Sequence, residues 1–230
     1  MIYSIAGITV ELNFKYEYGR KKCERYLSEG IPSISLSASD KEIENELSLF
    51  PQNTEGTAEF DCIFRKLYNI APSFDKILIH GAAIMKNGKG FLFVAPSGTG
   101  KTTHIKRWGK RFGNEVVIID GDKPFVGFEN NVPTVWGSPR SGKEGWNNPI
   151  SAPLVGIALL ERNDTNSITP VSPTEIFDNL FMQFYFPPKD DAARLTTQII
   201  NRILENVPLY RLRCNMETEA AEVAFSEMNK

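Results

Sequence analysis

The feature that most constrains this chain is a short glycine loop between a buried apolar run and a helical segment. Residues 91–94 read FLFV, residues 95–100 read APSGTG, and a helix is predicted for residues 101–112, before Gly113. Glycine allows the tight backbone turn that such a loop requires. Inward-pointing backbone N–H groups, together with the N-terminus of the following helix, create an anion-binding site. The segment therefore predicts an α/β fold with an anion site at the end of a strand.

The loop matches the phosphate-binding pattern G-x-x-x-x-G-K-[ST], with Ala95 in place of the first glycine. Lys101 is expected to reach the β- and γ-phosphates, and the Thr102 hydroxyl to bind Mg²⁺. The alternative is a chance match in an ordinary turn, but the flanking strand and helix argue against it. ATP, or another nucleotide donor, and Mg²⁺ are the expected cofactors. The expected nucleotide-binding residues are Ser97, Gly98, Thr99, Gly100, Lys101, Thr102 and Thr103.

The chain around this loop mixes strands, helices and hairpins. Asn87-Gly88 predicts a hairpin between the apolar runs 76–86 and 90–95, and Asn130-Asn131 predicts another. This mixture favours an α/β fold with mixed β-sheets and flanking helices over a regular doubly wound one. We expect a single domain, 1–230, with an N-terminal strand and helix portion (1–75) and a phosphate-loop core (76–230).

The remaining elements follow from apolar periodicity and from helix start signals. Asn215 is expected to cap the last helix. Strands are predicted at 2–14, 33–37, 115–120, 152–162 and 208–214, and helices at 20–28, from Ser39, and at 57–70, 173–184, 190–206 and 217–228.

Composition narrows the classes of partner. A formal net charge of -2 gives no reason to expect nucleic acid or a membrane surface, and no apolar run is long enough to cross a bilayer. The N-terminus lacks the pattern of a signal peptide. Cys23, Cys62 and Cys214 are widely spaced and fit neither a disulfide framework nor a zinc motif. These features predict a cytoplasmic protein.

Two carboxylates follow the strand VVIID in the sequence IIDGDKP. Asp120 and Asp122 stand where a Mg²⁺ ligand or a proton acceptor belongs, at a strand end near a phosphate loop. The alternative is a plain turn after a strand. Asp122 is the stronger candidate because Gly121 permits close approach of the backbone.

The chain has two histidines, and both lie near the loop in sequence. His80 lies within the apolar strand ILIHGAA, where a core histidine is the alternative to a catalytic one. His104 lies one turn into the helix after the loop and is expected to pack or to face solvent.

Arginine and lysine side chains offer further anion contacts. Arg140 and Lys143 lie in the polar stretch WGSPRSGKEGWNNP (136–149), which is long enough to suggest function. They could stabilise a transferring phosphate or hold an acidic substrate group, or they could simply be solvated. Arg211 and Arg213 alternate onto one face of a strand and are expected to be solvated or paired.

The segments IHGAAIMKNGKGFLFVAPSGTGKTT and VVIIDGDKPFV together resemble the catalytic domain of HPr kinase/phosphorylase and its PEP-carboxykinase-like relatives. The likeness covers about residues 76–160 well. It is closest to compact, stand-alone serine kinases of the HPr type, which share GSP-x-x-GKEGWN and YRLRCN.

The resemblance implies phosphoryl transfer to a hydroxyl within a mixed-sheet phosphate-loop domain. His80 takes the position of the histidine that assists the catalytic aspartate. Asp122 matches the last acid of the family's pair, but Gly121 stands at the first, so which of Asp120 and Asp122 is base and which is metal ligand stays open. Oligomers are common in this family, which makes a homo-oligomer an expectation.

The acceptor is a free small molecule or a peptide or protein serine. HPr itself is not expected, because 230 residues leave no room for the N-terminal domain of full-length HPr kinases. The leading hypothesis is an ATP- and Mg²⁺-dependent kinase in which Lys101, His80, Asp120, Asp122 and Arg140 act in catalysis. A non-catalytic nucleotide-binding module or an NTPase is the alternative.

Overall fold

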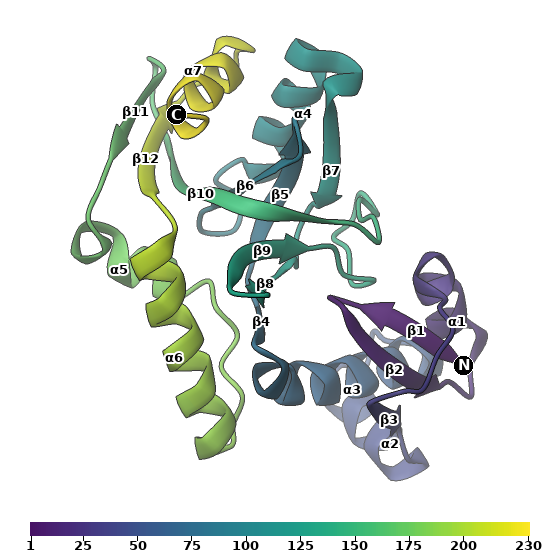
Figure 1. Cartoon of the computed structure of the whole chain (residues 1–230). Coiled ribbons are helices and arrows are strands. Elements are labelled where there is room, and N and C mark those ends of the chain that lie inside the picture. The colour runs from purple at the N-terminus through teal and green to yellow at the C-terminus, as the bar shows by residue number, and fades with distance from the viewer.

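The N-terminal portion combines a small sheet with three helices (Figure 1). The structure, a computed structural model, describes residues 1–230. The segment predicted as one strand is a hairpin, because Ala6 and Gly7 form a turn with φ of 52° and 73°. Its elements are β1 (Ile2–Ile5), β2 (Ile8–Asn13), α1 (Glu17–Cys23), β3 (Ile34–Ser37), α2 (Asp40–Leu49) and α3 (Glu55–Ile70).

The larger portion is a mixed nine-stranded sheet with helices on both faces, which confirms the predicted α/β class. The helix predicted for residues 101–112 has those bounds. Its elements are β4 (Lys76–Leu78), β5 (Gly81–Lys86), β6 (Lys89–Val94), α4 (Lys101–Phe112), β7 (Val116–Asp120), β8 (Phe125–Glu129), β9 (Val132–Trp136), β10 (Ser151–Arg162), β11 (Ser167–Pro170), α5 (Pro173–Phe181), α6 (Asp190–Asn206), β12 (Leu209–Cys214) and α7 (Glu219–Met228).

The long strand β10 joins the two halves of the large sheet. The strand order is β4-β8-β9-β10-β6-β5-β7, with β12 paired to β10 and β11 paired to β12. The start of β10 pairs with β9 in antiparallel fashion, and its later residues run parallel to β6 and to β12. The predicted hairpins are both present, since β5 pairs with β6 and β8 with β9.

Strand register gathers several chain segments at one edge of this sheet. Val94, the last residue of β6, lies opposite Gly81 at the start of β5 and beside Leu159 of β10. Asp120, the last residue of β7, lies opposite Ala83. The glycine loop and the Asp-Gly-Asp turn therefore leave the sheet at the same edge, which is where α/β sheets bind ligands.

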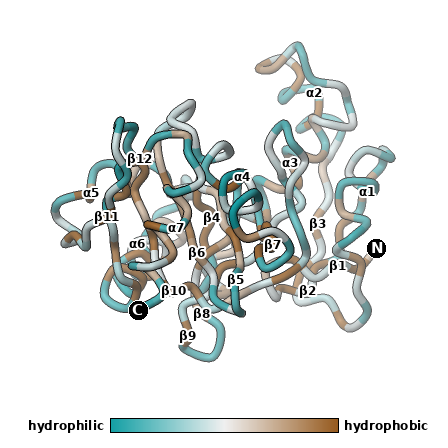
Figure 2. The backbone as a smooth tube through the Cα atoms, turned by 90° about the horizontal axis from the view of Figure 1, so that it is seen from above, coloured by the Kyte–Doolittle hydropathy of each residue, from teal (hydrophilic) through white to brown (hydrophobic).

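Alternating side chains build a separate core on each face of the sheet. In β6, Leu92 and Val94 join the core under α5 and α6, whereas Phe91 and Phe93 join the core under α4 and α7. Trp108 of α4 is fully buried in the second core. Figure 2 shows the resulting pattern, with hydrophobic strands inside and hydrophilic loops outside.

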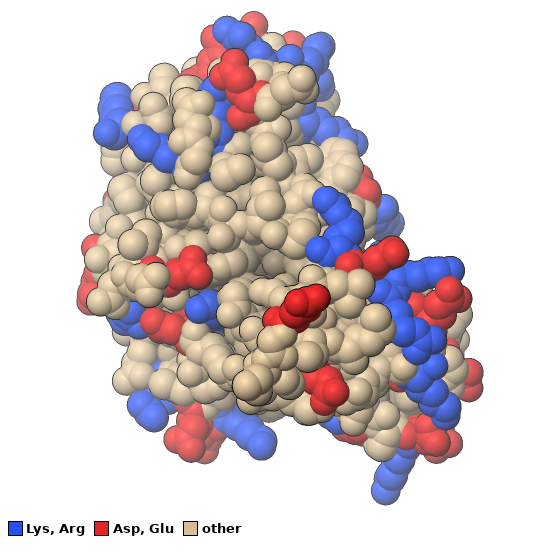
Figure 3. Space-filling model, turned by 45° about the vertical axis from the view of Figure 1, so that its right-hand side comes forward, with Lys and Arg blue, Asp and Glu red and all other residues tan.

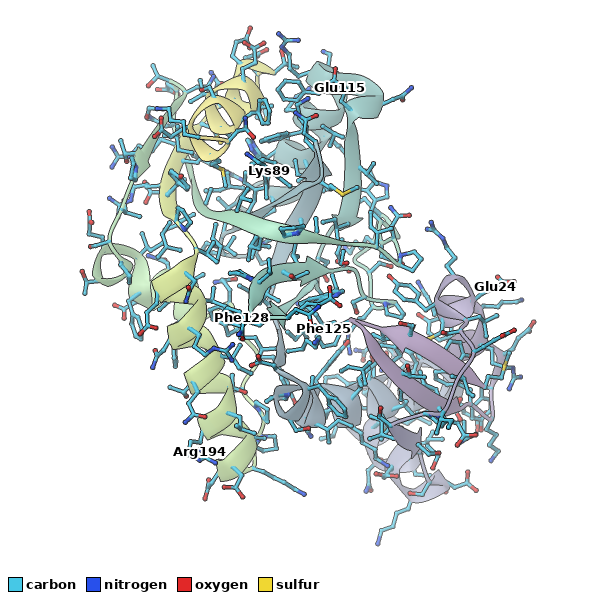
Figure 4. All side chains as sticks on the ribbon, viewed as in Figure 1. Glu24, Lys89, Glu115, Phe125, Phe128 and Arg194 are labelled. Carbon is cyan, nitrogen blue, oxygen red and sulfur yellow. The ribbon has the colours of Figure 1, made fainter.

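The N-terminal portion shares a third core with the large sheet. Phe125 of β8 is buried with Tyr3 and Phe64 of the N-terminal portion, whereas Phe128 joins the core under α5 and α6. Figure 4 labels both phenylalanines, which belong to β8 of the large sheet. Burial of these aromatic side chains fixes how the N-terminal elements sit against β4, β8 and β9.

Two further sequence expectations need correction, and one strand was missed. His80 does not lie within a strand, because the apolar run 76–86 breaks after β4 and resumes in β5 with a different strand partner. Asn215 does not cap α7, whose N-cap is Thr218; its side chain instead accepts from the Glu217 N–H and donates to the Asp164 carbonyl. The strand β11 was not predicted.

The surface carries both signs of charge. On the face drawn in Figure 3, basic and acidic side chains are interspersed around a largely uncharged middle region. Arg211 and Arg213 are paired, as expected, because both contact Glu161. None of the helices combines the length and hydrophobicity needed to span a bilayer.

Candidate functional site

The glycine loop (residues 95–100) requires glycine for its backbone conformation. Gly98 and Gly100 have φ of 79° and 126°, while a Cβ atom on either residue would meet nothing within 4 Å. The positive φ, and not a lack of space, excludes other residues there. Gly100 is also the N-cap of α4 and supplies no capping side chain. The first N–H groups of α4 are therefore left for another acceptor.

Lys101 is folded back onto the loop. Its ammonium group donates to the Ala95 carbonyl at 2.8 Å, and only 7% of the residue is exposed. Burial lowers the pKa of Lys101, and the nearby negative charge of Asp122 opposes that shift. The loop thus holds a cation close to Asp122 although 21 residues separate the two in sequence.

Arg162, at the end of β10, contacts the backbone of the glycine loop. Its guanidinium donates to the carbonyl of Thr99 at 2.9 Å and to that of Gly98. Arg162 was not predicted, because nothing local in the β10 sequence indicates that its last side chain reaches Thr99, 63 residues earlier. These contacts hold the backbone carbonyls of the loop at the end of β10.

Asp120 organises the turn after β7. It is fully buried, and its Oδ1 accepts from the backbone N–H groups of Asp122 and Lys123, both at 2.8 Å. Its Oδ2 accepts from the N–H of Ser138 at 2.9 Å. Burial raises the pKa of Asp120 to about 7 despite these three hydrogen bonds. Both oxygens are thus occupied by the backbone.

Asp122 is the accessible carboxylate of the pair, with 31% of its side chain exposed. Its Oδ1 lies 3.4 Å from Nε2 of His80. A hydrogen bond from His80 is the main cause that lowers the pKa of Asp122, and the positive charges of Lys123 and Lys101 act in the same direction while burial opposes them. Asp122 is therefore ionised at neutral pH.

Gln183 completes a chain of side chains behind Asp122. Its Nε2 donates to the Asn179 carbonyl at 3.1 Å, so its Oε1 faces Nδ1 of His80, also at 3.1 Å. Nδ1 is thereby the donor to Gln183, and a hydrogen bond from Nε2 to Asp122 as well requires the ring to carry both protons. The backbone N–H of His80 also donates to the Gln183 carbonyl. No local pattern points to Gln183, which is 103 residues from His80.

The polar loop (residues 137–150) is anchored against the Asp-Gly-Asp turn. The N–H of Gly121 donates to the Trp146 carbonyl at 2.8 Å, and the Asn148 side chain donates to the Ile118 carbonyl at 2.6 Å. Gly142 allows the loop to lie against Asp122, since a Cβ atom there would come within 3.2 Å of the Asp122 Cβ. The loop thus forms one wall beside Asp122.

The two basic side chains of the polar loop differ in their contacts. Arg140 forms an ion pair with Asp61 of α3 at 2.8 Å, which engages its charge with the N-terminal portion. Lys143 is exposed. The structure thus pairs His80 with Asp122 and places Lys101 where it feels the charge of Asp122. Asp120 holds the backbone of the same turn, and Arg140 is engaged by Asp61.

The residues at this edge suit a Mg²⁺ ion that is held mostly by phosphate oxygens. No group of three or more His, Cys, Asp or Glu side chains forms a ready metal cluster. The available donors are the Asp122 carboxylate and the Thr102 hydroxyl. Mg²⁺ typically takes one or two protein oxygens together with phosphates and water, so this donor set fits the ion.

Comparisons with known proteins identify a family. The family model described as "SynChlorMet cassette protein ScmC" matches residues 51–223, well over half of the chain, and the chain belongs to this family. Comparison with curated proteins gave no match. Among solved structures, the Hpr(Ser) kinase/phosphatase from Coxiella burnetii is similar over 56% of this chain and 91% of that chain, with 11% sequence identity and a TM-score of 0.29.

Proposed function

We propose that this protein is a kinase that transfers the γ-phosphoryl group of ATP to a hydroxyl group in the presence of Mg²⁺. The observation that carries the proposal is the position of the His80–Asp122 pair and Lys101 at one edge of the sheet, beside the free N–H groups of α4. A helix N-terminus after a glycine loop binds phosphate, and a paired carboxylate beside it can accept a proton.

In the proposed reaction, the acceptor oxygen forms a bond to the γ-phosphorus, and the bond between that phosphorus and the β-phosphate oxygen breaks. The hydroxyl proton passes to Asp122, and ADP leaves. Lys101 exchanges its contact with the Ala95 carbonyl for the β- and γ-phosphates. When bound, Mg²⁺ neutralises charge on the phosphate oxygens.

The remaining residues position these groups. His80 orients the Asp122 carboxylate, and Thr102 offers its hydroxyl to Mg²⁺. Asp120 shapes the turn through its three backbone hydrogen bonds. Either Asp120 or Asp122 could be the base from the sequence. This geometry favours Asp122 as the base and leaves Asp120 a supporting role. The residues proposed to hold the nucleotide phosphates are Ser97, Gly98, Thr99, Gly100, Lys101, Thr102 and Thr103.

The test is transfer of label from γ-labelled ATP in an extract of metabolites and peptides. We expect a new labelled species with the wild-type protein and none with Lys101→Ala. Label in a low-mass product identifies a small-molecule acceptor, and label on a polypeptide identifies a peptide or protein serine. Hydrolysis without transfer would make the protein an NTPase, and nucleotide binding without loss of the γ-phosphate would make it a non-catalytic module.

Asp122→Asn separates the two roles open to this carboxylate. As the general base, Asp122 is expected to contribute a factor of about 10² to 10⁴ to the rate. The variant should therefore lose that factor while its Mg²⁺ requirement and nucleotide affinity stay unchanged. A raised Mg²⁺ requirement would instead identify Asp122 as a metal ligand, and wild-type turnover would exclude both roles.

A further inference from the structure

A cleft of about 580 Å³ opens beside the glycine loop, and neither His80 nor Asp122 lines it. One wall is the first half of α4, with His104 and Arg107, and the other is formed by the ends of β10 and β12 with the residues that follow them. Gly98 and Gly100 border it. The volume lies in the range of small-molecule sites.

His104 brings a fixed hydrogen-bond donor to this cleft. The indole N–H of Trp108 donates to its Nε2 at 2.9 Å, and burial lowers the pKa of His104 to about 3, so the ring is neutral. The proton of the neutral ring is therefore on Nδ1. Only 3% of the residue is exposed, and Nδ1 is buried without a hydrogen-bond partner in the protein. Buried donors without a partner are rare in native proteins.

Arg107, one turn further along α4, supplies a second such donor. Its Nε atom is buried and has no partner in the protein. Leaving a buried donor unpaired is costly. Two unpaired donors on one wall of one cleft indicate that a ligand with acceptor atoms belongs there.

The charges lining the cleft favour an uncharged polar ligand. Arg162 is engaged with the glycine-loop carbonyls, and Glu161 pairs with Arg211 and Arg213. The lining carries two arginines (Arg107 and Arg162) and two glutamates (Glu161 and Glu217), so its formal charges sum to zero and do not call for a further phosphate. Met216 lies at the rim and is 66% exposed, where its polarisable thioether can contact the face of a ring.

We propose that this cleft binds the nucleoside of the phosphoryl donor, with the Nδ1–H of His104 and the Nε–H of Arg107 as donors to acceptor atoms of the base or sugar. The inference rests on the proposed phosphate-binding role of the glycine loop. It adds where the uncharged part of the donor lies, and it assigns a binding role to two residues that phosphoryl transfer itself does not use.

The test compares ATP with inorganic tripolyphosphate, which carries the phosphates without a nucleoside. Binding of each to the full-length protein is measured by calorimetry in Mg²⁺ buffer. Arg107→Met keeps the apolar part of the side chain and removes its donors. We expect about tenfold weaker binding of ATP by this variant, as lost hydrogen bonds to a charged group predict, and unchanged binding of tripolyphosphate. His104→Phe, which keeps a buried ring, should show the same pattern.

Arg111→Met is the matched control. Arg111 lies one turn beyond Arg107 on the same helix and pairs with Glu222 outside the cleft. The Arg111→Met variant should bind ATP and tripolyphosphate with unchanged affinity. Equal affinity of the wild type for ATP and tripolyphosphate, or equal losses for both ligands in Arg107→Met, would overturn the cleft assignment while the phosphate loop stands. A wild-type protein that binds neither ligand would overturn the proposed function as well.

Discussion

The two sides of the glycine loop differ in how completely their polar groups are paired. On one side, Gln183, His80 and Asp122 form a connected chain, and Asp120 saturates both oxygens with backbone donors. On the other side, His104 and Arg107 keep buried donors without partners. Groups that are fixed before the ligand arrives are suited to chemistry, whereas unpaired groups are suited to ligand recognition. The difference suggests that the loop separates a reacting side from a holding side.

The largest expected effect is on the free energy of unfolding of the protein, and it comes from Asp120 on the reacting side. Asp120→Ala leaves three backbone N–H groups, those of Asp122, Lys123 and Ser138, without their acceptor. Unsatisfied buried donors cost about 1 to 3 kcal/mol each, partly offset by removing a buried carboxyl group, so we expect a loss of about 3 kcal/mol. Urea unfolding monitored by tryptophan fluorescence measures this loss.

Asp122→Ala is the natural control for that prediction. Asp122 lies two residues away and its side chain accepts no backbone hydrogen bond, so we expect a loss below about 1 kcal/mol, as for other partly exposed ion pairs. A loss equal to that of Asp120→Ala would contradict the division of the two carboxylates into a supporting and a reacting one.

A second effect concerns the holding side and its dependence on pH. The pKa of His104 is lowered from 6.5 to about 3, because burial disfavours the charged ring. Between these values the unfolded state binds more protons, so stability is retained above pH 6.5 and is lost as the pH falls toward 3. The slope can reach about 1.4 kcal/mol per pH unit, which amounts to about 2 kcal/mol at pH 5.

The measurement is the free energy of unfolding at pH 7, 6 and 5 for the wild type and for His104→Phe. The variant loses the acceptor of the Trp108 N–H and will be less stable at every pH. Its loss of stability with falling pH should nevertheless be smaller than that of the wild type. Parallel curves would show that His104 does not carry the acid sensitivity. The exposed side chains contribute alike to both proteins.

Sequence predicted the local features of this edge because they depend on near neighbours. Asn87-Gly88 specified a hairpin, and positive φ at Gly98 and Gly100 accounts for the two glycines of the loop. The strand that ends in Asp120 and the helix after Lys101 were also predicted, since apolar runs and start signals are short-range.

Features that depend on distant partners were not predicted. The run around His80 reads as one strand, yet it divides between β4 beside β8 and β5 beside β6, which no local pattern encodes. The spacing of Asp120 and Asp122 could not tell which carboxylate is buried, because Ser138 on another segment supplies the third donor. Arg162 and Gln183 reach the site only through the tertiary fold.

The smallest expected effect tests whether the connected chain on the reacting side matters for chemistry. Gln183→Leu fills the same largely buried space, 9% exposed in the wild type, and removes the acceptor for Nδ1 of His80. The His80 ring is then free to turn away from Asp122. Loss of one orienting hydrogen bond of about 1 to 1.5 kcal/mol predicts a fall of about tenfold in kcat, with KM for ATP unchanged. Gln198→Leu, at an exposed position on α6, should leave kcat unchanged. A rise in KM for ATP without a change in kcat would place Gln183 on the holding side and remove the division between the two sides.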